Sequence, residues 1–382
     1  MVTHSINTAD VVVIGGGVIG LSVARALALR GAGTIALIER SHPGSEASSA
    51  AAGILAPQAE ADCVDDFFDL ACQSRTLYRS FASSLLEETG IDVELDNSGT
   101  LYLAFNEEDE KEISRRYEWQ TRAGLTVERL TAEDARLIEP CISENVRAAL
   151  RFPLDVQVEN RRLLSALVEA NQQHSVSLMT GTNVESLRVQ RNKLEGIETS
   201  RGFISSRNVV IAGGAWTSFL KASDKALPDF RIEPVRGQML CFDSNPRLSR
   251  HVIYSPRGYV VPRINGRLLS GSTTEFAGFD KSVTAFGVHS ILTRALEIST
   301  LISKLPLIDL WAGLRPHAPD NLPVLGPYKE IEGLFYATGH YRNGILLAPI
   351  TGDLIAEAVC EGIVSPLLAS FAPERFTPIG VN

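Results

Sequence analysis

The stretch Val11-Val-Val-Ile-Gly-Gly-Gly-Val-Ile-Gly-Leu-Ser-Val-Ala-Arg25 decides the fold of this chain. It begins with four consecutive apolar residues, which are typical of a buried strand, and continues with apolar residues at helical spacing as far as Leu29. Between these two parts lies the pattern G-x-G-x-x-G, formed by Gly15, Gly17 and Gly20. A strand, a glycine-rich turn and a helix in this order indicate a site for a dinucleotide.

Each glycine of the pattern has a physical task. Gly15 is expected to make the tight turn, Gly17 to let a pyrophosphate approach the backbone at the helix N-terminus, and Gly20 to let the helix pack closely on the strand. A second apolar strand over residues 34–38 ends in Glu39, where an acid is expected to hold the ribose hydroxyls. These features together predict a dinucleotide, either NAD or FAD.

Length and composition narrow the class of protein. A chain of 382 residues is too long for one ordinary core, so two domains are expected, and 45% apolar with 21% charged residues is typical of a folded, soluble protein. The net charge of −9 argues against broad nucleic-acid binding. No uncharged apolar stretch reaches the roughly 18 residues of a membrane span, and the first ten residues lack the pattern of a secretory signal.

The five cysteines are scattered along the sequence. They form neither a C-x-x-C pair nor a cluster with histidines, which indicates reduced thiols and no structural zinc. Reduced thiols together with the missing signal pattern predict a cytoplasmic protein. No metal site is expected.

The order of strand patterns indicates that the chain leaves the nucleotide-binding sheet and rejoins it. Residues 208–211 are a second buried strand that runs into glycines, and residues 334–337, a glycine turn and a helix over 345–359 repeat the arrangement. Between these returns, residues 252–274 are rich in strands around a hairpin turn at 264–267. The sequence therefore predicts an α/β fold, α+β overall, with a Rossmann-like nucleotide-binding domain and a second, mainly antiparallel sheet, both discontinuous in sequence.

Helical patterns stand out in three other places. Residues 66–89 have apolar side chains at steps of three to four, and residues 107–122 form a charged pattern typical of a solvated helix. Thr131 and Asp134 have the spacing of a capping box, which predicts that a further short helix begins there.

The run of small residues at 47–53 has two interpretations. Small side chains suit a backbone that lies flat against a large planar ligand, because bulkier ones would push the ligand away. They equally suit a helix packed tightly on a neighbouring element. Composition alone does not separate the two.

Five motifs along the chain carry a family resemblance. They are Val13-Ile-Gly-Gly-Gly-Val-Ile-Gly20 with Glu39, Ala50-Ala-Ala-Gly-Ile-Leu-Ala-Pro57, Gly258-Tyr-Val-Val-Pro-Arg263 with Gly271-Ser-Thr273, Trp311-Ala-Gly-Leu-Arg-Pro316, and Gly339-His-Tyr-Arg-Asn-Gly-Ile-Leu-Leu-Ala-Pro349. With these motifs the chain resembles the D-amino-acid oxidase superfamily of FAD-dependent oxidoreductases, and within it the ThiO-type glycine oxidases. The resemblance covers nearly the whole chain.

The resemblance implies two domains and a non-covalent FAD. The FAD-binding domain would comprise residues 1–88, 153–231 and 312–382, and the substrate-binding domain residues 89–152 and 232–311. The sarcosine-oxidase branch attaches its flavin through a cysteine close to the C-terminal motifs. Because no cysteine lies between Cys241 and Cys360, covalent attachment is not expected here.

The resemblance also implies which residues hold the FAD. The first helix would carry the pyrophosphate, Glu39 and Arg40 the ribose, the small residues the stretch toward the isoalloxazine, and the backbone of Val184 the adenine. A loop beginning at His340 would wrap the pyrimidine end of the flavin, where a helix N-terminus stabilises negative charge. The implied set is Gly15, Gly17, Val18, Ile19, Gly20, Glu39, Arg40, Ala47, Ser48, Ala52, Gly53, Ile54, Val184, His340, Tyr341, Arg342, Asn343, Gly344, Ile345 and Leu346.

For the substrate, the resemblance places four residues around an amino acid. Arg315 would bind the carboxylate, since a guanidinium matches it with two parallel hydrogen bonds, and Arg342 and Tyr259 would lie close to the same group. Thr274 stands where a main-chain carbonyl receives the substrate amine.

The implied reaction is the oxidation of glycine or another small amine, such as sarcosine or a small D-amino acid. A hydride would pass from Cα to flavin N5, the imine would hydrolyse to a 2-oxo acid and ammonia, and oxygen would be reduced to hydrogen peroxide. No residue is expected to act as an acid or base, because the sequence has no Ser/His/Asp set and a deprotonated amine needs none. Orientation of the substrate by Arg315 and Tyr259 would carry catalysis.

The resemblance also implies partners for the protein, and two alternative functions stay open. We expect a homo-oligomer, a tetramer as in similar glycine oxidases, and handover of the imine to a thiazole-forming enzyme of thiamine synthesis. One alternative is a D-amino-acid or D-hydroxyproline dehydrogenase that passes electrons to a quinone. The alternative from another class is a non-catalytic flavin-binding subunit of a complex.

Overall fold

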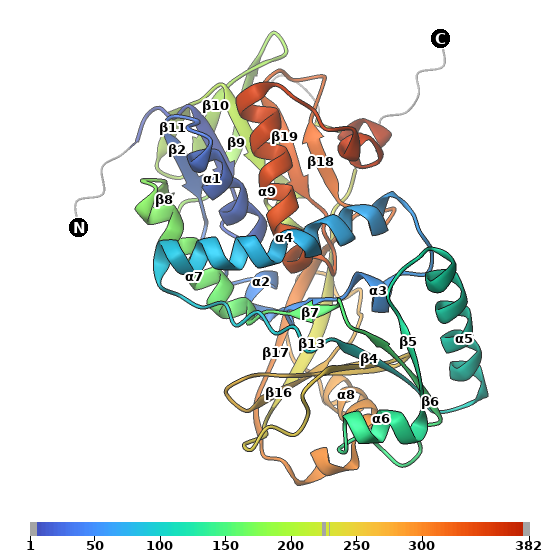
Figure 1. Ribbon diagram of the computed structural model, residues 1–382. Coiled ribbons are helices and arrows are strands. Elements are labelled where there is room, and N and C mark those ends of the chain that lie inside the picture. Colours follow the sequence, from blue (N-terminus) through green and yellow to red (C-terminus); the bar gives the residue numbers. More distant parts are fainter. Residues whose placement is uncertain (1–5, 224–226, 229, 377–382) are drawn as a thin grey trace.

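The computed structural model describes residues 6–223, 227–228 and 230–376 (Figure 1). The outer ends of the two terminal FAD-binding segments, residues 1–5 and 377–382, therefore lie outside the described residues. Figure 1 shows two bodies of secondary structure, with a helix-covered sheet in the upper half of the view and a larger sheet in the lower half. The predicted mixed α/β fold with two main sheets is confirmed.

The first sheet is built on the strand that opens the sequence. Val13 of its central strand lies between Val210 and Leu37 of the two neighbours, in parallel register. Both predicted returns of the chain to this sheet are confirmed. Its strands are, in spatial order, β18 (Val324–Pro327), β19 (Leu334–Thr338), β12 (Asn208–Ile211), β1 (Val11–Ile14), β2 (Ile35–Ile38) and β8 (Ser177–Met179), all parallel except β18.

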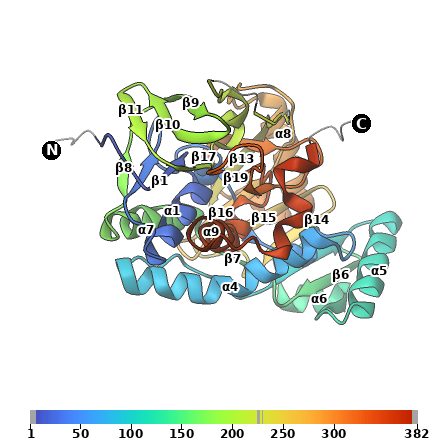
Figure 2. The same ribbon diagram turned by 90° about the horizontal axis from the view of Figure 1, so that it is seen from above.

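Helices cover one face of this sheet and a small sheet covers the other (Figure 2). Central strands buried on both faces explain why the sequence shows continuous apolar runs there. The helices are α1 (Val18–Leu29), α4 (Asp66–Thr89), α7 (Asn160–Gln173) and α9 (Gly344–Glu361), and the small antiparallel sheet comprises β9 (Val184–Gln190), β10 (Lys193–Thr199) and β11 (Gly202–Ser205).

Capping residues at the two ends of a helix determine where it begins and where it ends. Helix α4 begins where Asp65 accepts a hydrogen bond from the N–H of Phe68 and ends at Gly90, which has a left-handed φ of 70°. The predicted capping box is present, because Thr131 and Asp134 cap each other's backbone at the start of α6 (Ala132–Ile138). Helix α5 (Glu107–Arg122) spans the charged segment as predicted.

The second sheet has eight strands and is mainly antiparallel, as predicted. The exception is the pairing of β4 (Thr100–Ala104) with β14 (Val252–Ser255), which is parallel. Helices α6 and α8 (Ala285–Ile298) pack on one of its faces. The strands are, in spatial order, β17 (Leu307–His317), β13 (Glu233–Asp243), β16 (Arg267–Gly271), β15 (Gly258–Pro262), β14 (Val252–Ser255), β4 (Thr100–Ala104), β6 (Ala148–Phe152) and β5 (Glu128–Thr131).

Short elements lie where the chain crosses between the two sheets. These are α2 (Ala47–Ala50), β3 (Ile54–Leu55), α3 (Pro57–Glu60), β7 (Val156–Gln157) and the 3-10 helix η1 (Gly214–Phe219). Three further 3-10 helices lie elsewhere, η2 (Thr300–Lys304) between α8 and β17, and η3 (Pro366–Phe371) and η4 (Pro373–Phe376) after α9. Strand β17 belongs to the eight-stranded sheet along its length, so the expected domain border between residues 311 and 312 falls inside a strand.

Within the described ranges, no single helix is long and apolar enough to cross a bilayer. Helix α9 and residues 366–376 pass this test only when taken together, by length and composition, and they are bent by 107° at the break between them.

Candidate functional site

A cavity of about 400 Å³ lies between the two main sheets. The six-stranded sheet contributes the turn between β1 and α1, the end of β2 and the start of α9. The eight-stranded sheet contributes residues of β13, β14, β15 and β17. Segments from both halves of the molecule therefore meet around one space.

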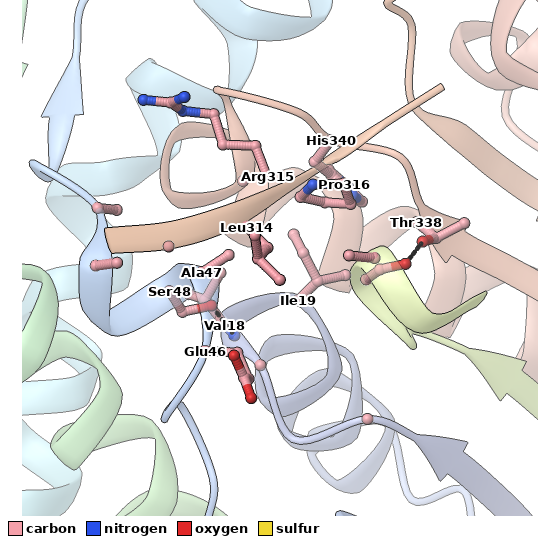
Figure 3. Close-up of a pocket in the computed structure, with 18 of the residues that line it drawn as sticks. Val18, Ile19, Glu46, Ala47, Ser48, Leu314, Arg315, Pro316, Thr338 and His340 are labelled. Atoms are coloured by element: carbon pink, nitrogen blue, oxygen red, sulfur yellow. Dashed lines mark hydrogen bonds between the residues drawn. The ribbon is translucent and has the colours of Figure 1, made fainter. Parts of the chain in front are cut away.

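The glycine turn forms one end of this cavity. Gly15 has a φ of +107°, and a Cβ there would lie 2.4 Å from the carbonyl oxygen of Ala212, so only glycine fits. A Cβ on Gly20 would lie 1.9 Å from the carbonyl oxygen of Gly15, which confirms close packing of α1 on the turn. The N–H of Val18 donates to the Ser48 hydroxyl at 3.0 Å (Figure 3). The N-terminus of α1 thus opens toward the cavity.

Glu39 is held at the end of β2 by the backbone. Its two carboxylate oxygens accept the N–H groups of Gly16 and Ser41, each at 2.8 Å. The next residue, Arg40, lies with its guanidinium 3.6 Å from the centre of the Trp216 ring and 2.8 Å from a carboxylate oxygen of Glu46. An acid and a stacked cation therefore line this end together.

The start of α9 forms another wall. His340 is buried, and burial lowers the pKa of its ring to about 3, so the ring is neutral at pH 7. Its Nε2 lies 3.1 Å from the Thr351 hydroxyl. Tyr341, with a φ of 46°, donates its N–H to the Pro316 carbonyl at 2.9 Å, which joins the start of α9 to β17. A ring with so low a pKa binds a proton weakly, which supports the expectation that His340 is not a base.

Arg315 projects into the cavity from β17. Leu314 and Arg315 leave this strand on opposite sides (Figure 3). The Arg315 guanidinium donates to the Thr273 carbonyl at 3.0 Å and to the Ser272 hydroxyl at 2.7 Å, which are neutral acceptors. A Cβ on Gly237, in the adjacent strand β13, would lie 2.2 Å from Arg315 Nη2. The side chain therefore occupies a space that only glycine leaves open.

The other expected substrate residues lie along the same wall. The Tyr259 hydroxyl donates to the Met239 sulfur at 3.5 Å, and its ring lies 5.5 Å from that of Tyr254. Arg342 forms an ion pair with Glu60 at 3.4 Å. The sequence did not point to Glu60 or Tyr254, because neither stands in a distinctive pattern.

Most of the residues predicted for the site line the cavity, and three do not. Gly20 packs inside α1, and Leu346 is buried within α9. Thr274 is exposed and lies outside the cavity lining, and the hydroxyl of the preceding Thr273 accepts from the N–H of Gln238 in β13. The lining residue in this segment is Ser272, which stands in the motif Gly271-Ser-Thr273 but had no predicted role.

The small-residue segment combines both of its interpretations. Residues 47–50 form the short helix α2, which packs on β17 where a Cβ on Gly313 would lie 2.5 Å from the Ala50 Cβ. The same segment lines the cavity. Arg263, which is buried, holds its end by donating to the Ala52 and Val158 carbonyls, each at 2.7 Å.

Comparison with known proteins identifies the family. Residues 10–358 match the model of the DAO family, described as FAD dependent oxidoreductase. The chain is an FAD-dependent oxidoreductase. It is 37% identical to a glycine oxidase of Geobacillus kaustophilus over 96% of this chain and 97% of that protein. A crystal structure of glycine oxidase from that organism superposes with a TM-score of 0.90 at 35% identity, over 97% of this chain and 99% of the other.

Two further relatives carry other descriptions. The chain is 33% identical to hydrogen cyanide synthase subunit HcnC of Pseudomonas aeruginosa, over 97% of both chains. It is 34% identical to a bifunctional protein ThiO/ThiG of Synechocystis over 97% of its own length but 54% of the relative's. This oxidoreductase therefore matches about half of that bifunctional protein.

The residues around the cavity fit FAD. The turn at Gly15 and Gly17 and the N-terminus of α1 suit a pyrophosphate, and the fixed carboxylate of Glu39 suits ribose hydroxyls. The N-terminus of α9 at Gly344 and Ile345 opens on the same cavity and places a partial positive charge there.

Proposed function

We propose that this oxidoreductase is an oxidase of glycine and other small amines, such as sarcosine and small D-amino acids. The observation that carries the proposal is the Arg315 guanidinium, which lies in the cavity bonded to neutral oxygens. Such a group can bind a carboxylate in bidentate fashion. The family and the glycine oxidase relatives support the same reading of the site.

The chain's residues would act mainly by orientation. Arg315 would bind the substrate carboxylate, with the Tyr259 hydroxyl beside it and Ser272 fixing the guanidinium. FAD, held without a covalent bond at the residues given above, supplies an acceptor for the hydride from Cα. His340, with a pKa of about 3 and its Nε2 against the Thr351 hydroxyl, is a poor proton acceptor, so the amine would release its proton to solvent before the hydride leaves Cα. The imine product of a primary amine such as glycine would hydrolyse to a 2-oxo acid and ammonia, and that of sarcosine to a 2-oxo acid and methylamine.

The test is anaerobic mixing of the FAD-loaded protein with glycine, sarcosine, D-alanine and D-proline while flavin absorbance is followed. Bleaching by at least one of these amines is expected, and no bleaching by any of them would contradict the proposal. Admission of air followed by a peroxide assay separates an oxidase from a quinone-dependent dehydrogenase.

A second candidate is a hydrogen cyanide synthase subunit, favoured by the relative that matches the chain over nearly its full length. Glycine oxidation that yields cyanide instead of ammonia would select this function. A cyanide electrode added to the same experiment distinguishes the two.

The biological setting is also proposed. The ThiO/ThiG relatives support delivery of the imine to a thiazole-forming enzyme in the cytoplasm, and rescue of a thiamine-requiring strain that lacks its glycine oxidase tests this.

We also propose a homo-oligomer, a tetramer by analogy with similar oxidases. Strand β17 supports this, because it is the edge of its sheet and exposes Leu307, Ile308 and Leu310. Light scattering measures the assembly.

A further inference from the structure

A carboxylate lies at the end of the cavity that is proposed to receive the substrate. Glu60 is the last residue of α3, its side chain is 29% exposed, and it lines the cavity with Tyr254, Tyr259 and Arg342. The Tyr254 hydroxyl donates to Glu60 Oε1 at 2.8 Å, and Arg342 Nη2 lies 3.4 Å from the same oxygen. A negative charge held in this way beside a carboxylate-binding site needs an explanation.

The two arginines of the site differ in whether they pair with Glu60. Its charge raises the pKa of Arg342 further, so Arg342 stays charged and is compensated. Arg315, in contrast, donates only to the neutral oxygens of Ser272 and Thr273 among the partners that the structure gives it. Glu60 also acts on Arg315, but only through space, and Arg315 has no ion pair among the contacts that the structure gives it. Of the two guanidinium groups at this end of the cavity, Arg342 is therefore paired with a carboxylate and Arg315 is not.

We propose that Glu60 sets the charge selectivity of the substrate site. By compensating Arg342 it leaves a single anion subsite at Arg315, so that amines with one carboxylate are accepted and amines with a second acidic group are repelled. This inference rests on the proposed amine oxidase function. It also revises the expected role of Arg342, which becomes the partner of Glu60 and does not bind the substrate carboxylate directly.

The physical reason is repulsion between like charges in a partly desolvated cavity. A second carboxylate on the substrate would face Glu60 and find Arg342 already paired. Glu60→Gln keeps the size of the side chain and an oxygen that can accept from Tyr254, but it removes the charge. In that variant Arg342 becomes a second anion subsite.

Two pairs of small molecules isolate this effect. Sarcosine and iminodiacetate are amines that differ by one carboxylate. Methoxyacetate and diglycolate are their ether counterparts, which have no amine and so bind without being oxidised. The second pair measures binding by perturbation of flavin absorbance, independently of turnover.

The experiment compares FAD-loaded wild type, Glu60→Gln and Glu128→Gln. The control Glu128 also pairs with an arginine, Arg151 at 3.0 Å, but lies on β5 outside the cavity lining. In Glu60→Gln, the affinity for diglycolate relative to methoxyacetate should rise about tenfold, as should kcat/KM for iminodiacetate relative to sarcosine. Glu128→Gln should leave both ratios unchanged.

Two further variants keep the proposal open to refutation. In Glu60→Gln/Arg342→Met the gain for diglycolate should disappear, and persistence of the gain would overturn the assignment to Arg342. Arg342→Met alone leaves Glu60 uncompensated and should lower the diglycolate ratio severalfold, which tests the idea even where Glu60→Gln fails to fold. Unchanged ratios in folded Glu60→Gln would overturn the proposal.

Failure of the proposed function gives a different result. If no amine bleaches the flavin but the two ether acids show the expected shift in Glu60→Gln, the charge-selective site stands and the oxidase function does not.

Discussion

Arg315 and Gly237 form a matched pair of residues on adjacent strands. The guanidinium lies across the backbone of Gly237, where a Cβ would come within 2.2 Å of it. Its direction is then fixed by Ser272 and Thr273. Because Gly237 on β13 has no side chain, the Arg315 guanidinium, which is proposed to bind the substrate, can lie in this position.

Arg315→Ala should raise KM for glycine by at least a hundredfold, because a charge-assisted bidentate contact contributes on the order of 3 kcal/mol. FAD should remain bound, since the residues proposed to hold it lie elsewhere. Steady-state kinetics and the flavin spectrum of the purified variant check this. Loss of FAD from the variant would contradict the role given to Arg315.

Gly237→Ala should lower kcat/KM by at least tenfold, because the new methyl group must displace the Arg315 guanidinium. The flavin spectrum should be retained. The double variant with Arg315→Ala is the control, since in that background the methyl group has nothing to displace. Additive losses in the double variant would show that Gly237 acts through something other than Arg315.

The sequence predicted part of this site. Arg315, Arg342 and Tyr259 stand in motifs, and all three line the cavity. Gly237 could not be predicted, because its need for glycine comes from the side chain of another strand and not from its own backbone angles. Glu60 was missed for a similar reason, since its meaning depends on Tyr254 and Arg342, which are distant in sequence.

Among the elements, the long helix α4 is joined to α1 and α7 by one carboxylate. Glu88 on α4 accepts hydrogen bonds from Arg25 on α1, at 2.9 Å, and from Ser84. It also lies 3.3 Å from His174 at the end of α7. Three helices on one face of the six-stranded sheet therefore meet at a single charged group.

This group should stabilise the fold in a pH-dependent manner. Burial would raise the pKa of Glu88, but the hydrogen bonds from Arg25 and Ser84 outweigh it and lower the pKa to about 2. A depressed pKa stabilises the folded state above the unfolded pKa of about 4.3 and ceases to do so as the pH falls toward 2. Glu88→Gln should therefore lower the free energy of unfolding by about 1 to 3 kcal/mol at pH 7.

Chemical denaturation at several pH values checks this prediction. The variant should lose less stability than wild type between pH 5 and pH 2. The neighbouring exposed residue provides the control, because Glu87→Gln should change stability by less than about 0.5 kcal/mol. Equal effects of the two substitutions would refute the role of Glu88.

The elements that the sequence predicted well have capping residues at their own ends. Asp65 and Gly90 cap α4, and its bounds follow from them. The segment at 47–53 could not be settled in this way. It forms α2 because β17 has Gly313 beneath Ala50, and its end is held by Arg263, so tertiary contacts decide its conformation.

At the scale of the whole molecule, the cavity joins two sheets that have separate cores. Residues of β1 and β2 line it from one sheet, and residues of β13, β15 and β17 from the other. The strand patterns predicted both sheets, but their relative placement depends on contacts between segments far apart in sequence. A ligand that fills the cavity must contact both.

Binding of FAD should therefore stabilise both sheets together. At free FAD one hundred times above Kd, linkage predicts about 2.7 kcal/mol of added stability. Hydrogen exchange of the apo and FAD-loaded protein should show added protection at β1 and β2 and also at β13 and β15. ADP provides the control, because it carries only the adenine half and should protect the turn at Gly15 and Gly17 without protecting β13 and β15. If FAD protects the six-stranded sheet alone, the two halves of the cavity do not hold one ligand.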